Sequence, residues 1–368
     1  MLWPLKVALA VAACYLLWAG WYTHHHPVRS LAYSSSFFQG RPGGSEAISR
    51  FSPTANGTVG YDGQFFLYVA LDPAGARPYL DNAAYRYGRP LYPLVARAAA
   101  LGRAPAVPWT LLLVGIGAVT AAAFALATLL AREGASPWYG ALAGAYPGLF
   151  LGVSHDLSEP LAYGLVAVGL LARRRTLLGA AAVFALAGLT RETTLLFPLV
   201  LGLWLALADR RRRDGLLVLA VSIVPWLALK AGLAVWLGSF GTPAQAHVEP
   251  VPLLGLVRQW PWNDYDVQEL LAVVFPGLLA LAVVWWATRR LSFELCLLAA
   301  NVLVLVLLLP KLSYVNYLAS GRIASGVVVA FVLCVPALTR SGAVAKLWLP
   351  VALWLLPWYS VLPEAMRR

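Results

Sequence analysis

Long apolar runs separated by short polar segments constrain this chain more than any other feature of its sequence. About eleven runs approach the roughly 20 residues that a helix needs to cross a bilayer. They lie near residues 5–22, 109–131, 138–153, 160–172, 176–189, 194–208, 215–238, 267–287, 291–309, 323–338 and 347–362. We therefore expect an all-α polytopic membrane protein of about eleven transmembrane helices, between ten and twelve, forming a single transmembrane domain over residues 1–368.

The composition excludes several other classes of protein. Hydrophobic residues make up 60% of the chain and charged residues only 12%, with a mean hydropathy of +0.71. A water-soluble enzyme, a disordered chain and a secreted disulfide scaffold are all inconsistent with these values. Cys14, Cys296 and Cys334 fall inside apolar runs, so they are interpreted as small buried hydrophobes and predict neither disulfides nor a cysteine-based zinc site.

The distribution of positive charge predicts the orientation. If the N-terminus is cytoplasmic, thirteen cations fall in short inner segments, and the short outer segments between runs hold far fewer. The inner cations are Lys6, Arg132, residues 173–175, residues 210–213, Arg289, Arg290, Arg340 and Lys346. The net charge of +12 is thus explained as a topological signal, and no nucleic acid is expected as a partner.

The acidic residues show the opposite distribution. Only Glu133, Asp209, Asp214 and Glu294 lie on the inner side, and the other twelve of the sixteen acids lie on the outer side. Carboxylates contribute little to orientation, so this asymmetry indicates that the outer face uses them. We expect the functional site to face outward.

Residues 23–108 form a first extracytoplasmic loop that is too long to be a simple connection. Its segment GYDGQFFLYVALDP, residues 60–73, predicts a short helix lying on the membrane surface, with Asp62 at its start and Pro73 beyond its end. A second apolar segment, NAAYRYGRPLYPLVARAAALG, covers residues 82–102. It places Arg86 and Arg89 among several tyrosines.

This plan resembles the GT-C glycosyltransferase superfamily, which uses sugars carried on polyprenyl or dolichyl phosphate. The YDGQFF segment is similar to the first-loop motif of that superfamily, and Asp62 matches its catalytic aspartate. The resemblance implies a polyprenyl-phosphate-linked sugar donor. Many members carry two adjacent acids, whereas Asp62 is followed by Gly63 and the next acid is Asp72. The metal requirement and the acceptor are therefore left open.

Asp62 suits the general base that removes the proton of an acceptor hydroxyl, because partial burial raises the proton affinity of a carboxylate. The alternative is a structural role as a helix N-cap. Tyr61 and Gln64 are candidates to hydrogen-bond the sugar or to orient the carboxylate, and packing at the interface is the other interpretation.

A leaving phosphate requires a cationic pocket. Candidates for donor-phosphate binding are Arg86, Arg89, Arg191, Arg322 and Lys311. A guanidinium matches phosphate oxygens in a bidentate manner. The alternative for the loop arginines is that they extend toward lipid head groups.

The segment GVSHDLSEP, residues 152–160, brings His155, Asp156 and Glu159 within one helical turn. These residues, with Glu192, are candidates to bind substrate. A divalent cation is a further option, although one histidine and two acids are too few to specify a metal. The structural alternative is a capping box formed by Asp156 and Glu159.

A second long outer loop, residues 239–266, contains aromatic and acidic side chains, including Trp260, Trp262, Asp264 and Asp266. Such rings stack on sugar faces, and they equally suit an ordinary interfacial loop.

The sequence thus favours a membrane glycosyltransferase that moves one sugar from a polyprenyl-phosphate donor to a lipid, glycan or protein acceptor. The excess of Arg over Lys and the richness in Ala, Leu and Gly favour a bacterial plasma membrane. A lipid-linked glycan polymerase or ligase, a secondary transporter or lipid flippase, and a non-enzymatic scaffold are the alternatives. A transporter requires a polar site near the bilayer midplane, which the sequence does not reveal.

Overall fold

The computed structural model describes residues 2–55, 58, 60–241 and 248–367, and within these ranges it contains helices and connecting segments but no strand. Five helical stretches are long and apolar enough to cross a membrane. They are Leu2–His25, Ala104–Arg132, Arg212–Leu237, Asp266–Thr288 and Tyr317–Arg340. A bent pair, Val344–Leu355 and Trp358–Met366, would add a sixth. The all-α membrane class is therefore supported, whereas the expected number of about eleven spans is not confirmed.

The main helices have the following bounds. They are α1 (Leu2–His25), α7 (Val107–Arg132), α10 (Glu159–Ala172), α11 (Leu177–Thr190), α12 (Leu196–Leu207), α13 (Arg212–Leu237), α16 (Phe275–Thr288), α17 (Phe293–Val302), α19 (Ser325–Arg340), α20 (Trp348–Leu355) and α21 (Trp358–Arg367). Four of the remaining apolar stretches have only 10–17 residues, namely Glu159–Ala172, Leu177–Thr190, Glu192–Leu207 and Phe293–Leu307. These short helices account for much of the difference from the expected count.

The other helical elements are shorter. They are η1 (Val28–Ala32), α2 (Ser36–Gln39), α3 (Glu46–Phe51), α4 (Gly63–Leu71), η2 (Arg77–Tyr79), α5 (Ala83–Tyr87), α6 (Leu91–Ala99), η3 (Ala104–Ala106), η4 (Pro137–Gly140), α8 (Ala141–Ala145), α9 (Pro147–Ser154), η5 (Glu192–Leu195), α14 (Leu254–Val257), α15 (Asp264–Glu269), η6 (Leu270–Val274), η7 (Leu303–Leu307), η8 (Lys311–Tyr314), α18 (Tyr317–Ile323) and η9 (Val344–Leu347).

The apolar run expected at 138–153 is not one continuous helix. The backbone leaves helical geometry at Tyr146 (ψ 121°), and Pro147 then begins α9. Proline lacks an amide hydrogen, so it interrupts a helix in its interior but fits the first turn of a new one. The break divides the run into α8 and α9.

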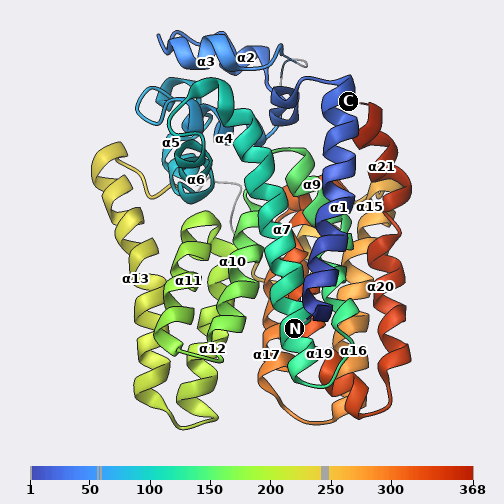
Figure 1. Ribbon diagram of the computed structural model, residues 1–368. Coiled ribbons are helices and arrows are strands. Elements are labelled where there is room, and N and C mark those ends of the chain that lie inside the picture. The colour runs from blue at the N-terminus through green and yellow to red at the C-terminus, as the bar shows by residue number, and fades with distance from the viewer. Residues whose placement is uncertain (1, 56–57, 59, 242–247, 368) are drawn as a thin grey trace.

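The bundle has two chemically different ends (Figure 1). The N-terminus and the arginine-rich segments after α10 and α12 lie at one end, which we call the basic end, whereas α2 to α6 gather at the opposite end, the loop end. Helix α10 packs against both α7 and α11. The contact with α7 is close, since a Cβ added to Gly164 would lie 2.6 Å from the carbonyl oxygen of Ala118.

The first long loop is folded over the loop end of the bundle. All nine residues of α4 are buried, with Leu67, Tyr68 and Ala70 inaccessible to solvent. The expectation that this helix lies on the membrane surface is therefore wrong, because α4 packs against α6 and α7 inside the protein. The second apolar segment of the loop, residues 82–102, is more exposed at its helix α6. This helix keeps Leu94 exposed on one face while Tyr92 and Ala96 are buried.

Candidate functional site

Five charged side chains from separate segments form a continuous ion-pair network at the loop end. Arg86 of α5 and Arg322 of α18 both contact the Asp62 carboxylate, at 2.9 Å and 2.8 Å respectively. Glu159, the first residue of α10, accepts a hydrogen bond from Arg322 at 2.9 Å and forms an ion pair of 2.9 Å with Arg191. We call these five residues the Asp62 network.

Two further acids complete the pairing of the loop-end arginines. Arg89 donates from its Nε to Glu192 at 2.9 Å, and its guanidinium lies 4.3 Å from the centre of the Tyr85 ring. Asp81 accepts from Nε and Nη2 of Arg86 at 2.8 Å and 2.7 Å. Arg86 therefore bridges Asp62 and Asp81.

These ion pairs are inside the protein. The side chains of Arg86, Arg191 and Arg322 belong to residues only 5–7% exposed, and Glu159 is fully buried. The interpretation that the loop arginines extend toward lipid head groups is therefore wrong, because acids of the protein hold them. Removing several charges from water is costly unless each one is paired.

Neither structural capping alternative is realised. Asp62 precedes α4, but its side chain makes no capping hydrogen bond to that helix. Asp156 and Glu159 form no capping box, because α10 begins after Ser158 and no side chain caps it. The Asp62 carboxylate instead points to two arginines, and Glu159 does the same.

Glycine at position 63 allows Asp62 to approach the turn before α10. A Cβ added to Gly63 would lie only 2.0 Å from the carbonyl oxygen of His155. Tyr61 fills the space beside this contact, with its ring 5.6 Å from that of His155 and 5.2 Å from the Arg322 guanidinium. The YDG sequence is thus explained by close packing as well as by chemistry.

Gln64 has a structural position. It is 1% exposed, and its side-chain oxygen accepts a hydrogen bond from the backbone N–H of Ser35 at 2.9 Å. This bond ties the start of α4 to the earlier part of the loop. The structure therefore does not favour the expectation that Gln64 contacts substrate.

The electrostatic environment differs between the acids. Burial raises the pKa of Asp62, but the charges of Arg86 and Arg322 outweigh burial and hold this pKa well below its ordinary value. Burial also raises the pKa of Glu192, but the charge of Arg89 outweighs burial and holds this pKa well below its ordinary value. The expectation that burial raises the proton affinity of Asp62 is therefore wrong, because the charges of the two arginines outweigh burial.

Asp156 behaves differently from the acids of the network. It is fully buried, and neither carboxylate oxygen has a hydrogen-bond partner within the described ranges. Burial raises its pKa well above the ordinary value. Its φ of 51° is unusual for a residue other than glycine. The adjacent His155 ring contacts the carbonyl oxygen of Leu151 and the hydroxyl of Ser154, each at 3.0 Å.

The network also has unused hydrogen-bonding capacity. Buried nitrogens without a partner among the described residues are found on three of its guanidiniums, at Arg86 Nη1, Arg191 Nε and Arg322 Nε. One oxygen of Glu159 also has no partner in this part of the chain. Such donors fit an anion with several oxygens, for which charge-assisted hydrogen bonds are strong.

Other expected site residues lie elsewhere. Lys311 begins η8 with an exposed side chain and forms no ion pair within the described part of the chain. In the loop 239–266, residues 242–247 lie outside the described residues. Trp260 and Trp262 are exposed, and Asp266 accepts from the backbone N–H of Asn263 at 2.8 Å, which is a local structural role.

Two acids in this part of the protein were not expected. Asp81 has no distinctive sequence pattern around it. Glu269 is fully buried and accepts a hydrogen bond from Ser320. An acid at the start of the apolar run 267–287 was the available signal for it.

The described residues contain no group of three or more His, Cys, Asp or Glu side chains arranged to hold a metal ion. Comparison of the chain with protein-family models, with curated proteins and with solved structures found no match.

Proposed function

We propose that the protein is a membrane glycosyltransferase of the GT-C type, which transfers one sugar from a polyprenyl-phosphate donor to a lipid, glycan or protein acceptor. The observation that carries this proposal is the set of unpartnered guanidinium nitrogens on Arg86, Arg191 and Arg322, two of which belong to the arginines that hold the Asp62 carboxylate. Phosphate binding requires the donors, and removal of a hydroxyl proton requires the carboxylate.

The proposal includes a location and a topology. The chain would cross the plasma membrane about eleven times, with the short helices acting as spans, and its N-terminus would be cytoplasmic. Concentration of the short arginine-rich segments at the basic end supports this orientation, because such segments remain on the cytoplasmic side. The Asp62 network would then face outward.

In the proposed reaction the donor phosphate takes over part of the pairing of Arg86 and Arg322. These guanidiniums then neutralise Asp62 less completely, and the pKa of Asp62 rises toward a value suited to a base. The acceptor hydroxyl oxygen bonds to the anomeric carbon, and its proton moves to Asp62. The bond between that carbon and the phosphate oxygen breaks, and the polyprenyl phosphate leaves with the electron pair.

The position of the network favours an enzyme over a transporter. Transporter sites lie near the middle of the membrane, between helices that move past each other. The Asp62 network lies where helices end, at Asp62 before α4, Glu159 at the start of α10 and Arg191 after α11. A glycan polymerase or ligase uses the same chemistry and remains the second candidate.

The test is turnover of radiolabelled polyprenyl-phosphate sugars by the purified protein in detergent with candidate acceptors. We expect Asp62→Asn to reduce turnover by at least about a hundredfold, the usual contribution of a general base. Glu46→Gln, an exposed acid of the same loop, is the matched control and should retain activity. Equal turnover by wild type and Asp62→Asn would remove the base from the mechanism. Products carrying many sugars would favour the polymerase.

A further inference from the structure

A hollow at the basic end combines cationic and apolar walls. Its lining residues are Arg173, Arg174, Leu177, Leu201, Trp204, Leu205, Asp209, Arg211 and Phe293, and we call it the basic hollow. Its cavity volume is about 240 Å³, a little below the roughly 300–1,000 Å³ of typical small-molecule sites, and it opens to the surface. It lies at the opposite end of the bundle from the Asp62 network.

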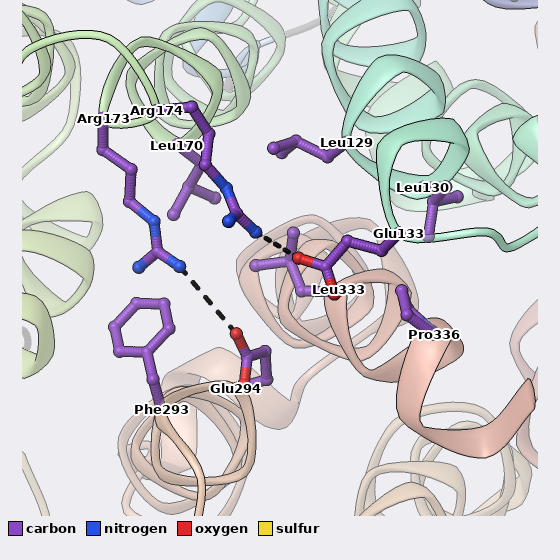
Figure 2. Close-up of a pocket in the computed structure, with 10 residues that line it drawn as sticks. All are labelled: Leu129, Leu130, Glu133, Leu170, Arg173, Arg174, Phe293, Glu294, Leu333 and Pro336. Atoms are coloured by element: carbon purple, nitrogen blue, oxygen red, sulfur yellow. Dashed lines mark hydrogen bonds and ion pairs between the residues drawn. The ribbon is translucent and has the colours of Figure 1, made fainter. Parts of the chain in front are cut away.

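A second hollow, whose cavity volume is only about 20 Å³, adjoins it and shares Arg173, Arg174 and Phe293 (Figure 2). Figure 2 shows both arginines directed into this space from the end of α10, toward Glu133 and Glu294 on the opposite side. Both side chains therefore line the two hollows at once.

Arg173 is placed to bind an anion. Its guanidinium lies 4.2 Å from the centre of the Phe293 ring, which fixes its orientation. Its carboxylate partner Glu294 is 3.8 Å away, which is too long for a hydrogen bond. Within the described residues the structure records no hydrogen bond from this guanidinium, and its side chain is 20% exposed.

The surroundings determine which anion fits. The apolar wall of Leu177, Leu201 and Leu205 lies beside the arginines, at the start of α11 and in the second half of α12; Leu177 is half-buried, and Leu201 and Leu205 are 3% and 5% exposed. Trp204, half-buried in the same wall, is a side chain that favours the boundary between water and lipid. An occupant with both a phosphate and a hydrocarbon tail matches both parts of the hollow, whereas a free phosphate matches only one.

We propose that the basic hollow binds an anionic phospholipid from the leaflet on the same side of the membrane. Arg173 would hold the lipid phosphate, Arg174 would join it by exchanging its ion pair with Glu133 for the phosphate, and Leu177, Leu201 and Leu205 would contact an acyl chain. The excess of cations over acids at this end attracts anionic lipids, and basic pockets between helices select them. This proposal requires only a membrane-embedded chain and is independent of the transferase activity.

The experiment is native mass spectrometry of the full-length protein in detergent, titrated with palmitoyl-oleoyl phosphatidylglycerol or with the corresponding phosphatidylcholine. Wild type should bind one phosphatidylglycerol molecule preferentially. The variant Arg173→Gln/Arg174→Gln should bind it roughly thirtyfold more weakly. The matched control Arg289→Gln/Arg290→Gln removes two exposed cations at the same end, outside the hollow, and should change affinity by no more than about threefold.

Two further measurements distinguish a loss of lipid binding from a loss of folding. Glu294→Gln removes the acid that competes for Arg173, so it should strengthen phosphatidylglycerol binding by about two- to fivefold. Glycerol 3-phosphate, which lacks acyl chains, should compete poorly. Equal loss in the two double variants, equal binding of the two lipids, unchanged or weaker binding by Glu294→Gln, or full competition by glycerol 3-phosphate would each overturn the proposal.

Discussion

Glu159 is the acid on which the stability of the Asp62 network depends most directly. It is fully buried, and one of its oxygens contacts both Arg191 and Arg322 at 2.9 Å. Glu159→Gln keeps the size of the side chain and an oxygen acceptor but removes the negative charge. The two guanidiniums would then share a neutral partner in a buried position.

The expected destabilisation follows from that geometry. Removing one charge of a buried pair leaves its partner uncompensated and costs about 3–5 kcal/mol. Glu159 compensates two arginines, although Arg322 retains Asp62 as a second partner. We therefore expect Glu159→Gln to lose about 3–5 kcal/mol in the free energy of unfolding. The loss should not be doubled for two arginines, because only Arg191 would lack another acidic partner among the described residues.

The assay is reversible unfolding in mixed micelles of dodecyl maltoside and SDS, followed by tryptophan fluorescence. Glu133→Gln is the matched control, because Glu133 pairs with Arg174 at the partly exposed basic end, and such pairs contribute about 0–1 kcal/mol. A loss of less than about 1 kcal/mol for Glu159→Gln would show that Glu159 does not compensate the two arginines as an ionised acid, and would refute the reasoning.

Three further predictions use the same unfolding assay. Because the folded pKa of Asp62 is lowered, its stabilising contribution is complete above the ordinary pKa of about 3.9 and is lost as pH falls below it. The difference between wild type and Asp62→Asn should thus be constant from about pH 5 to about pH 8, and a decrease between pH 7 and pH 5 would contradict this. Burial raises the pKa of Asp156, so the stability gained by Asp156→Asn should increase as pH rises above about 4, and a gain independent of pH would count against an ionisable Asp156. Gly63→Ala should lower the free energy of unfolding by about 1–3 kcal/mol, because its Cβ would overlap the His155 carbonyl. In the control Gly20→Ala the new Cβ meets no atom within 4 Å, so α1 should not be destabilised. Equal effects of the two substitutions would refute the packing argument.

The class of fold follows from the sequence because hydrophobic content and run length depend on local composition alone. The number of spans does not follow as directly. Pro147 divides one apolar run into α8 and α9, and α10, α11 and α12 are each shorter than a full crossing. Whether a short apolar helix spans or stops depends on its neighbours, which a single run of residues does not encode.

The components of the candidate site were predictable one by one, but their pairing was not. Arg191 and Arg322 were predicted as phosphate-binding residues, but their acidic partners in the protein were not. Their common partner Glu159 is 163 residues from Arg322, and only packing of α18 near the start of α10 brings them together. The burial of α4 was missed because its aromatic side chains suit a lipid surface as well as a protein interior.

Two charges of the Asp62 network match the helix ends that carry them. Glu159 begins α10, whereas Arg191 follows the last residue of α11. Acids are favoured at helix N-termini and cations at C-termini, each by about 0.3–1 kcal/mol or more when partly buried. The helix dipoles therefore stabilise Glu159 and Arg191 even when their ion-pair partners are engaged elsewhere. In the proposed reaction, the donor phosphate could therefore replace one carboxylate contact of an arginine while Glu159 and Arg191 stay in place.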